Sequence, residues 1–288
     1  MGSIINLIRV RQWIKNLLVF APLAFALDFN GKAISLELIA FSAFCFASSA
    51  VYIINDIIDI KSDRVHKTKR LRPIAAGKIS IHQALILELV LLIFAFYAAQ
   101  ELASQLTLIL GTYYILNLAY SLWLKKYLIL DIMIIAFGFI LRILAGAYAI
   151  SVDISNWILV VTFFAALFLA LGKRKNEVEL LEADSQNHRQ VLAGYTPDFL
   201  NQLLSITAGI TIVGYTLYTI DTETTAHFGT DKLLYTIPFV VFGIFRYFHL
   251  IYNRDRGGDP TNIFLTDKPL IIDIIIWIGV FIFIALKL

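Results

Sequence analysis

Long apolar runs follow one another along almost the whole chain and constrain its fold more than any other feature. About 20 apolar residues in a helix span the hydrocarbon core of a bilayer. The composition, 59% hydrophobic and 16% charged with a mean hydropathy of +0.78, is that of an integral membrane protein. We therefore expect an all-α, polytopic membrane protein with a single transmembrane domain over residues 1–288. The predicted spanning helices number nine, at about 14–30, 36–57, 80–99, 103–123, 129–150, 155–172, 198–220, 232–252 and 269–287.

The distribution of Lys and Arg predicts how these helices cross the membrane. Of 24 such residues, 19 fall in segments that nine helices place on one side. The opposite side holds Lys32, Lys232 and Lys287, and Arg142 and Arg246 lie within spans. By the positive-inside rule, this asymmetry predicts a plasma-membrane protein with a cytoplasmic N-terminus and an external C-terminus. No cleaved signal peptide is expected, because no long apolar run precedes the basic residues of the N-terminal segment.

Two long charged loops, at about 58–79 and 173–196, follow the second and the sixth predicted helix. Their separation by four helices suggests two four-helix halves, each with a charged loop after its second helix, plus a ninth helix. In that arrangement both loops lie at one cavity that is open to the cytoplasmic side. We therefore expect a functional site in these loops.

The first loop begins with NDIIDIKSD, in which Asp56, Asp59 and Asp63 stand at i, i+3 and i+7 and share one helix face. Like charges at this spacing repel one another, and the membrane environment strengthens the repulsion. A cation is therefore expected, and Mg²⁺ fits because it binds one or two carboxylates and completes its shell with water and phosphate oxygens. The alternative is a solvated helix end in which the same aspartates form salt bridges with nearby cations, namely Lys61, Arg64 and Lys67.

A basic run, HKTKRLRPIAAGK, follows the aspartates and contains a Pro and a Gly that break any helix. Either a topogenic role or attraction to anionic lipids would account for its net charge alone. A diphosphate held between Mg²⁺ and Lys or Arg side chains accounts for the carboxylates and the cations together. The candidate phosphate ligands in the run are Lys67, Lys69, Arg70 and Arg72.

Further candidates lie at the cytoplasmic ends of other predicted helices. In LGKRKNEVEL, Lys173, Arg174 and Glu177 directly follow a span. An i, i+3 salt bridge between Arg174 and Glu177 is the alternative to a role in a site. Lys125 lies at the end of the fourth predicted helix, in YSLWLKK, and Tyr120 lies earlier in the same helix. The alternative to a role of Lys125 in a site is that its side chain extends to the lipid headgroups.

Two arginines lie inside predicted spans, where they are costly unless they face the bundle interior, water or a bound anion. Arg246 lies only about one to two turns from the cytoplasmic edge and is expected to reach a phosphate. Arg142 lies deeper and is expected to be structural, paired with backbone carbonyls or a carboxylate. The last cytoplasmic loop, NRDRGGDPTNIFLTDKPL, is either a turn or an ordered lid that contributes Asp259 or Arg254.

The motif NDIIDIKSD resembles the NDxxDxxxD signature of the UbiA superfamily of intramembrane prenyltransferases, and DRxH, a basic stretch and RPIAAG follow it as in that family. YSLWLKK is similar to the family's Tyr-to-Lys motif at the end of the fourth helix. The likeness covers the whole chain. However, the family has a second DxxxD motif after the sixth helix, where this chain has GKRKNEVEL. This departure disfavours transfer of a prenyl group to an aromatic ring.

The segment GKRKNEVEL, in place of a second DxxxD motif, resembles the pattern of the decaprenyl-phosphate phosphoribosyltransferase branch of the superfamily. Three further segments also resemble that branch, namely DIMIIAFGFILRILAGAYA, LFLALGKRKNEV and IPFVVFGIFRYFHLIYNRDRGGDP. That resemblance implies Mg²⁺-dependent transfer of 5-phosphoribose from phosphoribosyl diphosphate (PRPP) to a polyprenyl (decaprenyl) phosphate, with release of diphosphate. In actinobacteria this reaction supplies arabinose donors for the cell wall. The donor carries a 5-phosphate and the acceptor a further phosphate, so a site with more Lys and Arg and fewer Asp is expected.

Roles for individual residues follow from the resemblance and from the charges. Asp56 and Asp59 are expected to hold Mg²⁺-diphosphate, with Asp63 as an additional or outer ligand and Asn55 as an orienting group. Glu177 is expected to hold a ribose hydroxyl or a metal-bound water. The candidate substrate-binding residues are Lys15, Arg64, Lys67, Lys69, Arg70, Arg72, Tyr120, Lys125, Lys173, Arg174, Glu177, Arg189, Arg246 and Asp259.

Two alternative functions stay open at this point. One is a UbiA-type prenyltransferase that moves a prenyl group from prenyl diphosphate to an aromatic acceptor. The other is a transporter, in which charged residues are expected near the middle of the membrane rather than at the cytoplasmic ends of the helices. The expected partners are PRPP, a polyprenyl phosphate and the bilayer, with no nucleic acid, and a homo-oligomer is compatible with the sequence.

Overall fold

The computed structural model describes residues 2–27, 29–182, 194–252 and 260–286. Within these ranges the regular elements are helices and no strand occurs. The chain divides into two compact units, Met1–Asp153 and Ile154–Leu288. The division falls after the fifth predicted spanning helix. The expected all-α fold is confirmed.

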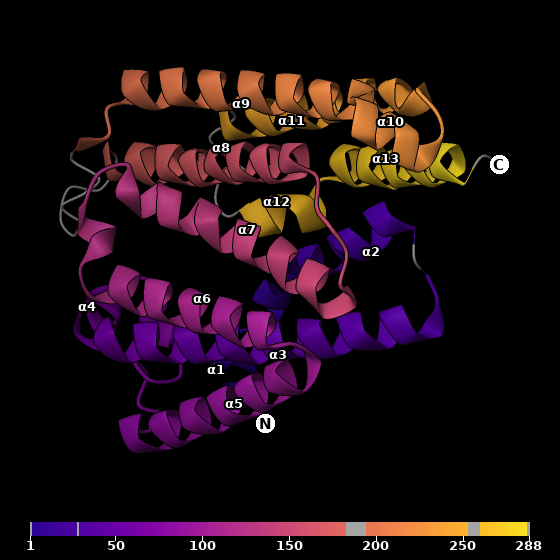
Figure 1. Cartoon of the computed structure of the whole chain (residues 1–288). Helices are drawn as coiled ribbons and strands as arrows, with labels where there is room; N and C mark the ends of the chain where they lie inside the picture. The colour runs from indigo at the N-terminus through magenta and orange to yellow at the C-terminus, as the bar shows by residue number, and fades with distance from the viewer. Residues whose placement is uncertain (1, 28, 183–193, 253–259, 287–288) are drawn as a thin grey trace. The chain divides into compact units, whose positions relative to one another are not determined.

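The first unit is built around α3 (Gly31–Ile58), a helix of 28 residues. Three further long helices, α5 (Ile81–Leu102), α6 (Ser104–Leu122) and α7 (Leu130–Ile150), pack against it (Figure 1). The short elements of this unit are α1 (Gly2–Leu7), the 3₁₀ helix η1 (Val10–Phe20), α2 (Ala21–Ala26), α4 (Ile60–Val65), η2 (Lys69–Leu71) and η3 (Leu124–Lys126).

The second unit contains four long segments. Helix α8 (Asn156–Glu182) packs along α9 (Pro197–Ile220), and α11 (Ile237–Tyr252) packs against α13 (Lys268–Ala285). The short elements are α10 (Thr222–Phe228), the 3₁₀ helix η5 (Lys232–Thr236) and α12 (Pro260–Thr266).

Side chains near the helix ends explain where several helices begin. Asn30 accepts a hydrogen bond from the Ala33 amide at the start of α3. Ser80 and Gln83 form a reciprocal capping box at the start of α5. Thr196 caps α9 and is followed by a proline in the first turn. These local signals satisfy amide groups that would otherwise lack partners.

Seven described helical segments are long and apolar enough to cross a membrane, as in a multi-pass membrane protein. They are Gly31–Ile58, Ile81–Leu102, Leu130–Ile150, Asn156–Glu179, Pro197–Ile220, Lys232–Tyr252 and Lys268–Ala285. The predicted span at 14–30 instead forms η1 and the short α2. The predicted span at 103–123 forms α6, whose 19 residues include the polar Gln105 and Asn117. The count of nine therefore stays a prediction.

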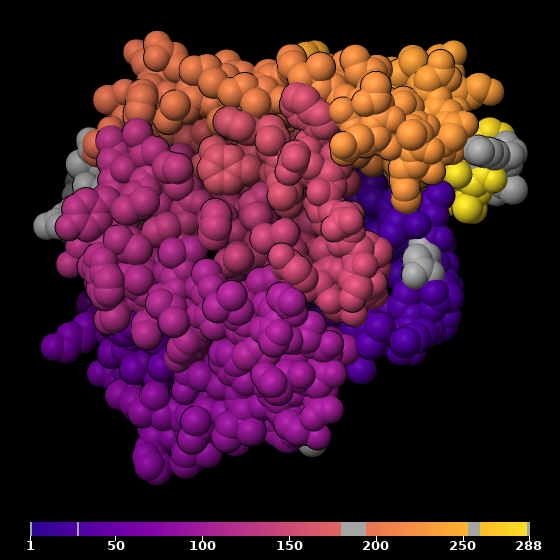
Figure 2. Space-filling view, in the orientation of Figure 1, coloured from indigo at the N-terminus to yellow at the C-terminus, as the bar shows by residue number. Residues whose placement is uncertain are grey.

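Small side chains allow the helices of the first unit to approach closely. Ala43 and Ala47 of α3, Ala95 and Ala99 of α5, and Ala145 of α7 are buried in one apolar cluster. Such residues favour helix packing within a bilayer, where burial of apolar surface from lipid supplies little driving force. The outer face of α5 carries large exposed apolar side chains and forms the purple lower edge of the space-filling view (Figure 2).

Gly146 of α7 marks the closest approach in this unit. A Cβ atom at this position would lie 1.9 Å from the Val19 carbonyl oxygen and 3.0 Å from Glu37 Oε1. The first of these distances is far shorter than any real contact, and the opposing atom belongs to the backbone of η1. A side chain at position 146 would therefore force η1 away from α7.

We expect Gly146→Ala to destabilise the protein by about 1–3 kcal/mol or more, because overpacking against a backbone cannot be relieved by rotation of a side chain. Gly209→Ala in α9 is a matched control, since nothing lies within 4 Å of its Cβ position and alanine favours helix. Heating in detergent followed by size-exclusion chromatography measures both. Equal melting temperatures for the two variants would contradict the close approach.

Candidate functional site

The three aspartates of the predicted motif lie where α3 passes into α4. Asp56 is in the last turn of α3, Asp59 separates the two helices, and Asp63 is in α4. The Asp59 amide donates to the Asn55 carbonyl (2.9 Å) and the Asp63 amide to the Asp59 carbonyl (2.8 Å), so near-helical hydrogen bonding continues through the junction. Asp56 and Asp63 are almost completely buried, at 2% and 3% exposure.

Each of these carboxylates contacts a cation from another part of the first unit. Arg72 Nη1 lies between two of them, 3.1 Å from Asp56 Oδ1 and 2.6 Å from Asp63 Oδ2. Lys125 Nζ of η3 donates to Asp59 Oδ1 at 2.6 Å. Arg9 donates from Nη2 to Asp56 Oδ1. We call these six residues, Arg9, Asp56, Asp59, Asp63, Arg72 and Lys125, the ion-pair cluster.

The cluster differs from the salt bridges that the sequence suggested as an alternative. The cations of the cluster come from other segments, since Arg9 directly precedes η1, Arg72 follows η2 and Lys125 lies in η3. Lys61, Arg64 and Lys67 are exposed. Of the predicted phosphate ligands in the basic run, Arg70 is also exposed, Lys69 is half-buried, and Arg72 reaches the aspartates. The predicted Lys15 lies half-buried in η1.

Arg9 is a member of the cluster that the sequence analysis treated only as a topogenic charge. Its backbone is left-handed (φ 52°, ψ 51°), which is uncommon for a residue with a Cβ and is found most often at functional sites. Its guanidinium also lies 4.7 Å from the centre of the Tyr52 ring, one turn before Asp56. The sequence signal for Arg9 is its position directly before the first apolar run, on the same predicted side as the aspartates.

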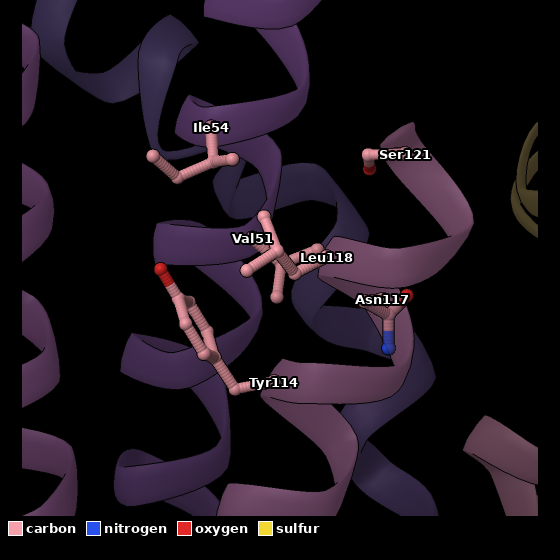
Figure 3. Close-up of a pocket in the computed structure, with 6 residues that line it drawn as sticks. All are labelled: Val51, Ile54, Tyr114, Asn117, Leu118 and Ser121. Atoms are coloured by element: carbon pink, nitrogen blue, oxygen red, sulfur yellow. The ribbon is translucent and has the colours of Figure 1, made fainter. Parts of the chain in front are cut away.

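A shallow crevice lies between α3 and α6 (Figure 3). Ser121 donates from Oγ to Asn55 Oδ1 at 3.2 Å, and the Tyr114 hydroxyl donates to Glu88 Oε1 of α5 at 2.6 Å. The Ser121 contact fixes the amide of Asn55, which directly precedes Asp56 of the ion-pair cluster. Tyr120, in the same turn of α6, is half-buried. The lining residues are Val51, Ile54, Tyr114, Asn117, Leu118 and Ser121.

Three predicted residues of the second charged segment, Lys173, Arg174 and Glu177, are helical, because α8 continues to Glu182. Arg174 is buried and forms the predicted i, i+3 ion pair with Glu177, whereas Lys173 is exposed. The neighbouring Lys175, which the sequence analysis did not single out, is also buried. Its Nζ donates to Asn201 Oδ1 (2.7 Å), lies 3.2 Å from Glu179 Oε1 and sits 4.0 Å from the Tyr252 ring centre.

The two arginines within spans have different partners. Arg142 donates to the Gly138 carbonyl (2.7 Å), to Asn16 Oδ1 (2.8 Å) and to the Tyr113 hydroxyl (3.2 Å), which confirms the expected structural role with a backbone partner. Arg246 forms a bidentate ion pair with Asp267, the residue that caps α13. A phosphate contact of Arg246 stays a prediction. Arg189, Arg254 and Asp259 lie outside the described residues.

His66 organises the turn between α4 and η2. Its Nδ1 accepts from the amides of Thr68 (3.2 Å) and Lys69 (3.4 Å). Partial burial lowers the pKa of His66 below its usual 6.5, and the charges of Lys69 and Arg72 lower this pKa further, against the opposing effect of Asp63. The folded turn therefore favours the neutral imidazole, whose Nδ1 can accept both hydrogen bonds.

Because the folded pKa is depressed, the turn binds a proton less readily than the unfolded segment, and its stability falls as the pH drops below about 6.5. We expect faster amide exchange in residues 66–72 at pH 5.5 than at pH 7.5, after correction for the intrinsic pH dependence. Hydrogen–deuterium exchange with mass spectrometry measures this. In His66→Gln the pH dependence should vanish, and its persistence there would assign it to another group.

The described residues contain no set of three or more His, Cys, Asp or Glu side chains placed to hold one metal ion. A cage of three carboxylates around one ion is therefore not present in this arrangement. The ion-pair cluster provides a cationic nitrogen of Arg72 between two buried carboxylates, together with two further cations, Arg9 and Lys125. This arrangement suits a ligand that carries both positive and negative charge.

Comparison with known proteins gives a consistent result over the whole chain. The model of the UbiA prenyltransferase family matches residues 17–266. A decaprenyl-phosphate phosphoribosyltransferase of Corynebacterium glutamicum is 35% identical over 284 residues, covering 96% of this chain and 84% of the relative. A protein of the same name from Mycobacterium tuberculosis is 32% identical over 285 residues, with 96% and 92% covered.

Solved structures share the fold. A UbiA homologue from Archaeoglobus fulgidus, bound to GPP and Mg²⁺, superposes with a TM-score of 0.72 at 18% identity, covering 98% of this chain and 99% of the homologue. A UbiA homologue from Aeropyrum pernix K1 superposes with a TM-score of 0.71 at 13% identity, covering 96% and 98%. At these identities the likeness concerns the fold alone.

Proposed function

The chain belongs to the UbiA prenyltransferase family, and we propose that it transfers 5-phosphoribose from PRPP to a polyprenyl phosphate and releases diphosphate. The observation that carries this proposal is the 32–35% identity, over 96% of the chain, to relatives named decaprenyl-phosphate phosphoribosyltransferase. The segment GKRKNEVEL supports it independently, because Lys and Arg suit a donor that carries an additional phosphate.

The reaction breaks the bond between C1 of the ribose and the diphosphate oxygen, and the electron pair leaves with diphosphate. A new bond forms between C1 and an oxygen of the acceptor phosphate. That oxygen is already anionic near neutral pH, so no strong base is required. The charge that the site must stabilise is therefore the one that develops on the leaving diphosphate and, with opposite sign, on the ribose ring.

The ion-pair cluster has donors that fit a magnesium ion. Mg²⁺ usually binds one or two protein carboxylates and keeps its other positions for water and substrate phosphates. Asp56 and Asp63 already share one cationic group, Arg72 Nη1, so their oxygens are arranged around a single positive charge. A bound Mg²⁺ would neutralise charge on the leaving diphosphate. Asp59 is proposed as a further ligand, directly or through water.

The other side chains bind and orient the phosphates. Arg72 and Lys125 are proposed to donate to the diphosphate, as is Arg9, and Asn55 is proposed to orient the leaving group. In α8, Lys173 and Arg174 are proposed to bind phosphate, with Glu177 at a ribose hydroxyl. The distribution of Lys and Arg supports a cytoplasmic site in the plasma membrane.

The reaction is tested with purified protein in detergent, radiolabelled PRPP, a polyprenyl phosphate and Mg²⁺. We expect label to enter the lipid phase with metal and not with EDTA. Absence of transfer, together with attachment of a prenyl diphosphate to an aromatic acceptor, would assign the protein to the prenyltransferases proper and remove the proposed role of the basic segment in α8.

Within that assay, Asp56→Asn should lower turnover on the order of 10²-fold or more, because the amide removes a charged ligand from the leaving-group site. Asp153→Asn is the matched control, since Asp153 is exposed and lies at the end of the first unit away from the cluster. Both variants should elute as the wild type does. Full turnover of Asp56→Asn at saturating Mg²⁺ would exclude the metal role.

A further inference from the structure

The members of the ion-pair cluster are fixed to different degrees. The three carboxylates stand on the helical junction of α3 and α4, and two of them are almost completely buried. Arg9 directly precedes η1, Arg72 follows η2 and Lys125 lies in η3, and their side chains are 22%, 24% and 13% exposed. The side chains of Asp56 and Asp63, at 2% and 4% exposure, are more buried than those of Arg9 and Arg72, whereas Asp59 and Lys125 are similarly exposed.

The charges of the cluster balance without any ligand. Asp56, Asp59 and Asp63 contribute three negative charges, which Arg9, Arg72 and Lys125 compensate. A divalent cation that enters alone finds the carboxylates already paired with Arg and Lys side chains. A diphosphate that enters alone meets three carboxylates. Neither ion by itself replaces the interactions that it disrupts.

We infer that Arg9, Arg72 and Lys125 act as internal counter-ions that hold the carboxylates until a metal–diphosphate complex exchanges with them. In the exchange the metal takes over the carboxylates, and the released Arg and Lys side chains bind the phosphate oxygens. Every charge keeps a partner throughout. The site therefore takes up the metal and the diphosphate group together and binds each of them weakly alone.

Arg9 has the geometry that such an exchange requires. Its guanidinium contacts two partners at once, the Asp56 carboxylate and the face of the Tyr52 ring. It can give up the carboxylate and keep the ring, which is one turn away on the same helix. The left-handed backbone of Arg9 directs this side chain from the start of η1 to the end of α3.

The inference rests on the proposed function in taking a divalent metal ion and a diphosphate as the ligands, and binding tests it without turnover. Mn²⁺ replaces Mg²⁺ as a paramagnetic probe, and methylenediphosphonate serves as a diphosphate that cannot be hydrolysed. Electron paramagnetic resonance measures free and bound Mn²⁺ with the full chain in lipid nanodiscs. Isothermal titration measures binding of the preformed Mn²⁺–methylenediphosphonate complex.

We expect Arg9→Gln to change the two affinities in opposite directions. Mn²⁺ alone should bind more tightly, because a competing cation is gone, and the preformed complex should bind more weakly, because a phosphate ligand is gone. Each change should lie within the range of about 5- to 150-fold that is typical of coupling between ligands. Arg11→Gln, at an exposed position two residues along η1, is the matched control and should change neither.

Two further variants keep the test decisive. Arg9→Lys should restore both affinities toward those of the wild type, which loss of a purely structural contact would not explain. Lys125→Gln repeats the test at Asp59 if Arg9→Gln does not elute as a folded protein. Changes in the same direction for both ligands, or no change in either, would overturn the exchange.

The binding result and the transfer assay fail independently. If Arg9→Gln changes the two affinities in opposite directions but no transfer from PRPP is observed, the ion exchange is supported and PRPP is rejected as the donor. If transfer from PRPP is observed but the affinities for Mn²⁺ and for the preformed complex change in the same direction, the reaction is supported and the ion exchange is rejected.

Discussion

Carboxylates buried at the end of a membrane-spanning helix must be neutralised, and the first unit is organised around this requirement. Removing one partner of a buried ion pair typically costs about 3–5 kcal/mol, because the other charge is left without compensation. The chain therefore returns to the α3–α4 junction three times, with Arg9, Arg72 and Lys125. The positions of η1, η2 and η3 follow from these contacts as much as from apolar packing.

The same requirement is met differently deeper in the unit. Arg142 has neutral acceptors on Asn16, Gly138 and Tyr113 and lies against the rings of Phe44 and Tyr113. Asn16 also donates to Ser48 and Cys45 of α3. Arginine contacts therefore fix η1 at its start, where Arg9 reaches the aspartates, and near its middle, where Asn16 accepts from Arg142.

Contacts between residues close in sequence were predictable, and contacts between distant segments were not. The 3, 4 spacing of helices placed Asp56, Asp59 and Asp63 on one face and Arg174 beside Glu177. Arg9 and Lys125 lie 47 and 66 residues away from the aspartates that they contact, and no local pattern predicts either pairing. The pairing of Arg246 with Asp267 was missed for the same reason.

Apolar composition alone does not predict the number of membrane-spanning helices correctly in every segment. Apolar content predicted a span at 14–30, where the arginine-anchored η1 forms instead. It also predicted α6, which is long enough to span but places Asn117 and Ser121 at the crevice between α3 and α6. Both segments make polar contacts with α3, from Trp13 and Asn16 in η1 and from Ser121 in α6. Their energies depend on partners that the apolar pattern does not encode.

The two charged segments of the chain differ in which sign of charge is anchored. At the α3–α4 junction Asp56 and Asp63 are buried and their partners Arg9 and Arg72 are more exposed. In α8 the order is reversed, because the side chains of Arg174 and Lys175 are 3% and 5% exposed and those of Glu177 and Glu179 are 30% and 22% exposed. An anchored carboxylate favours exchange of its cation for another cation, and an anchored cation favours exchange of its carboxylate for another anion.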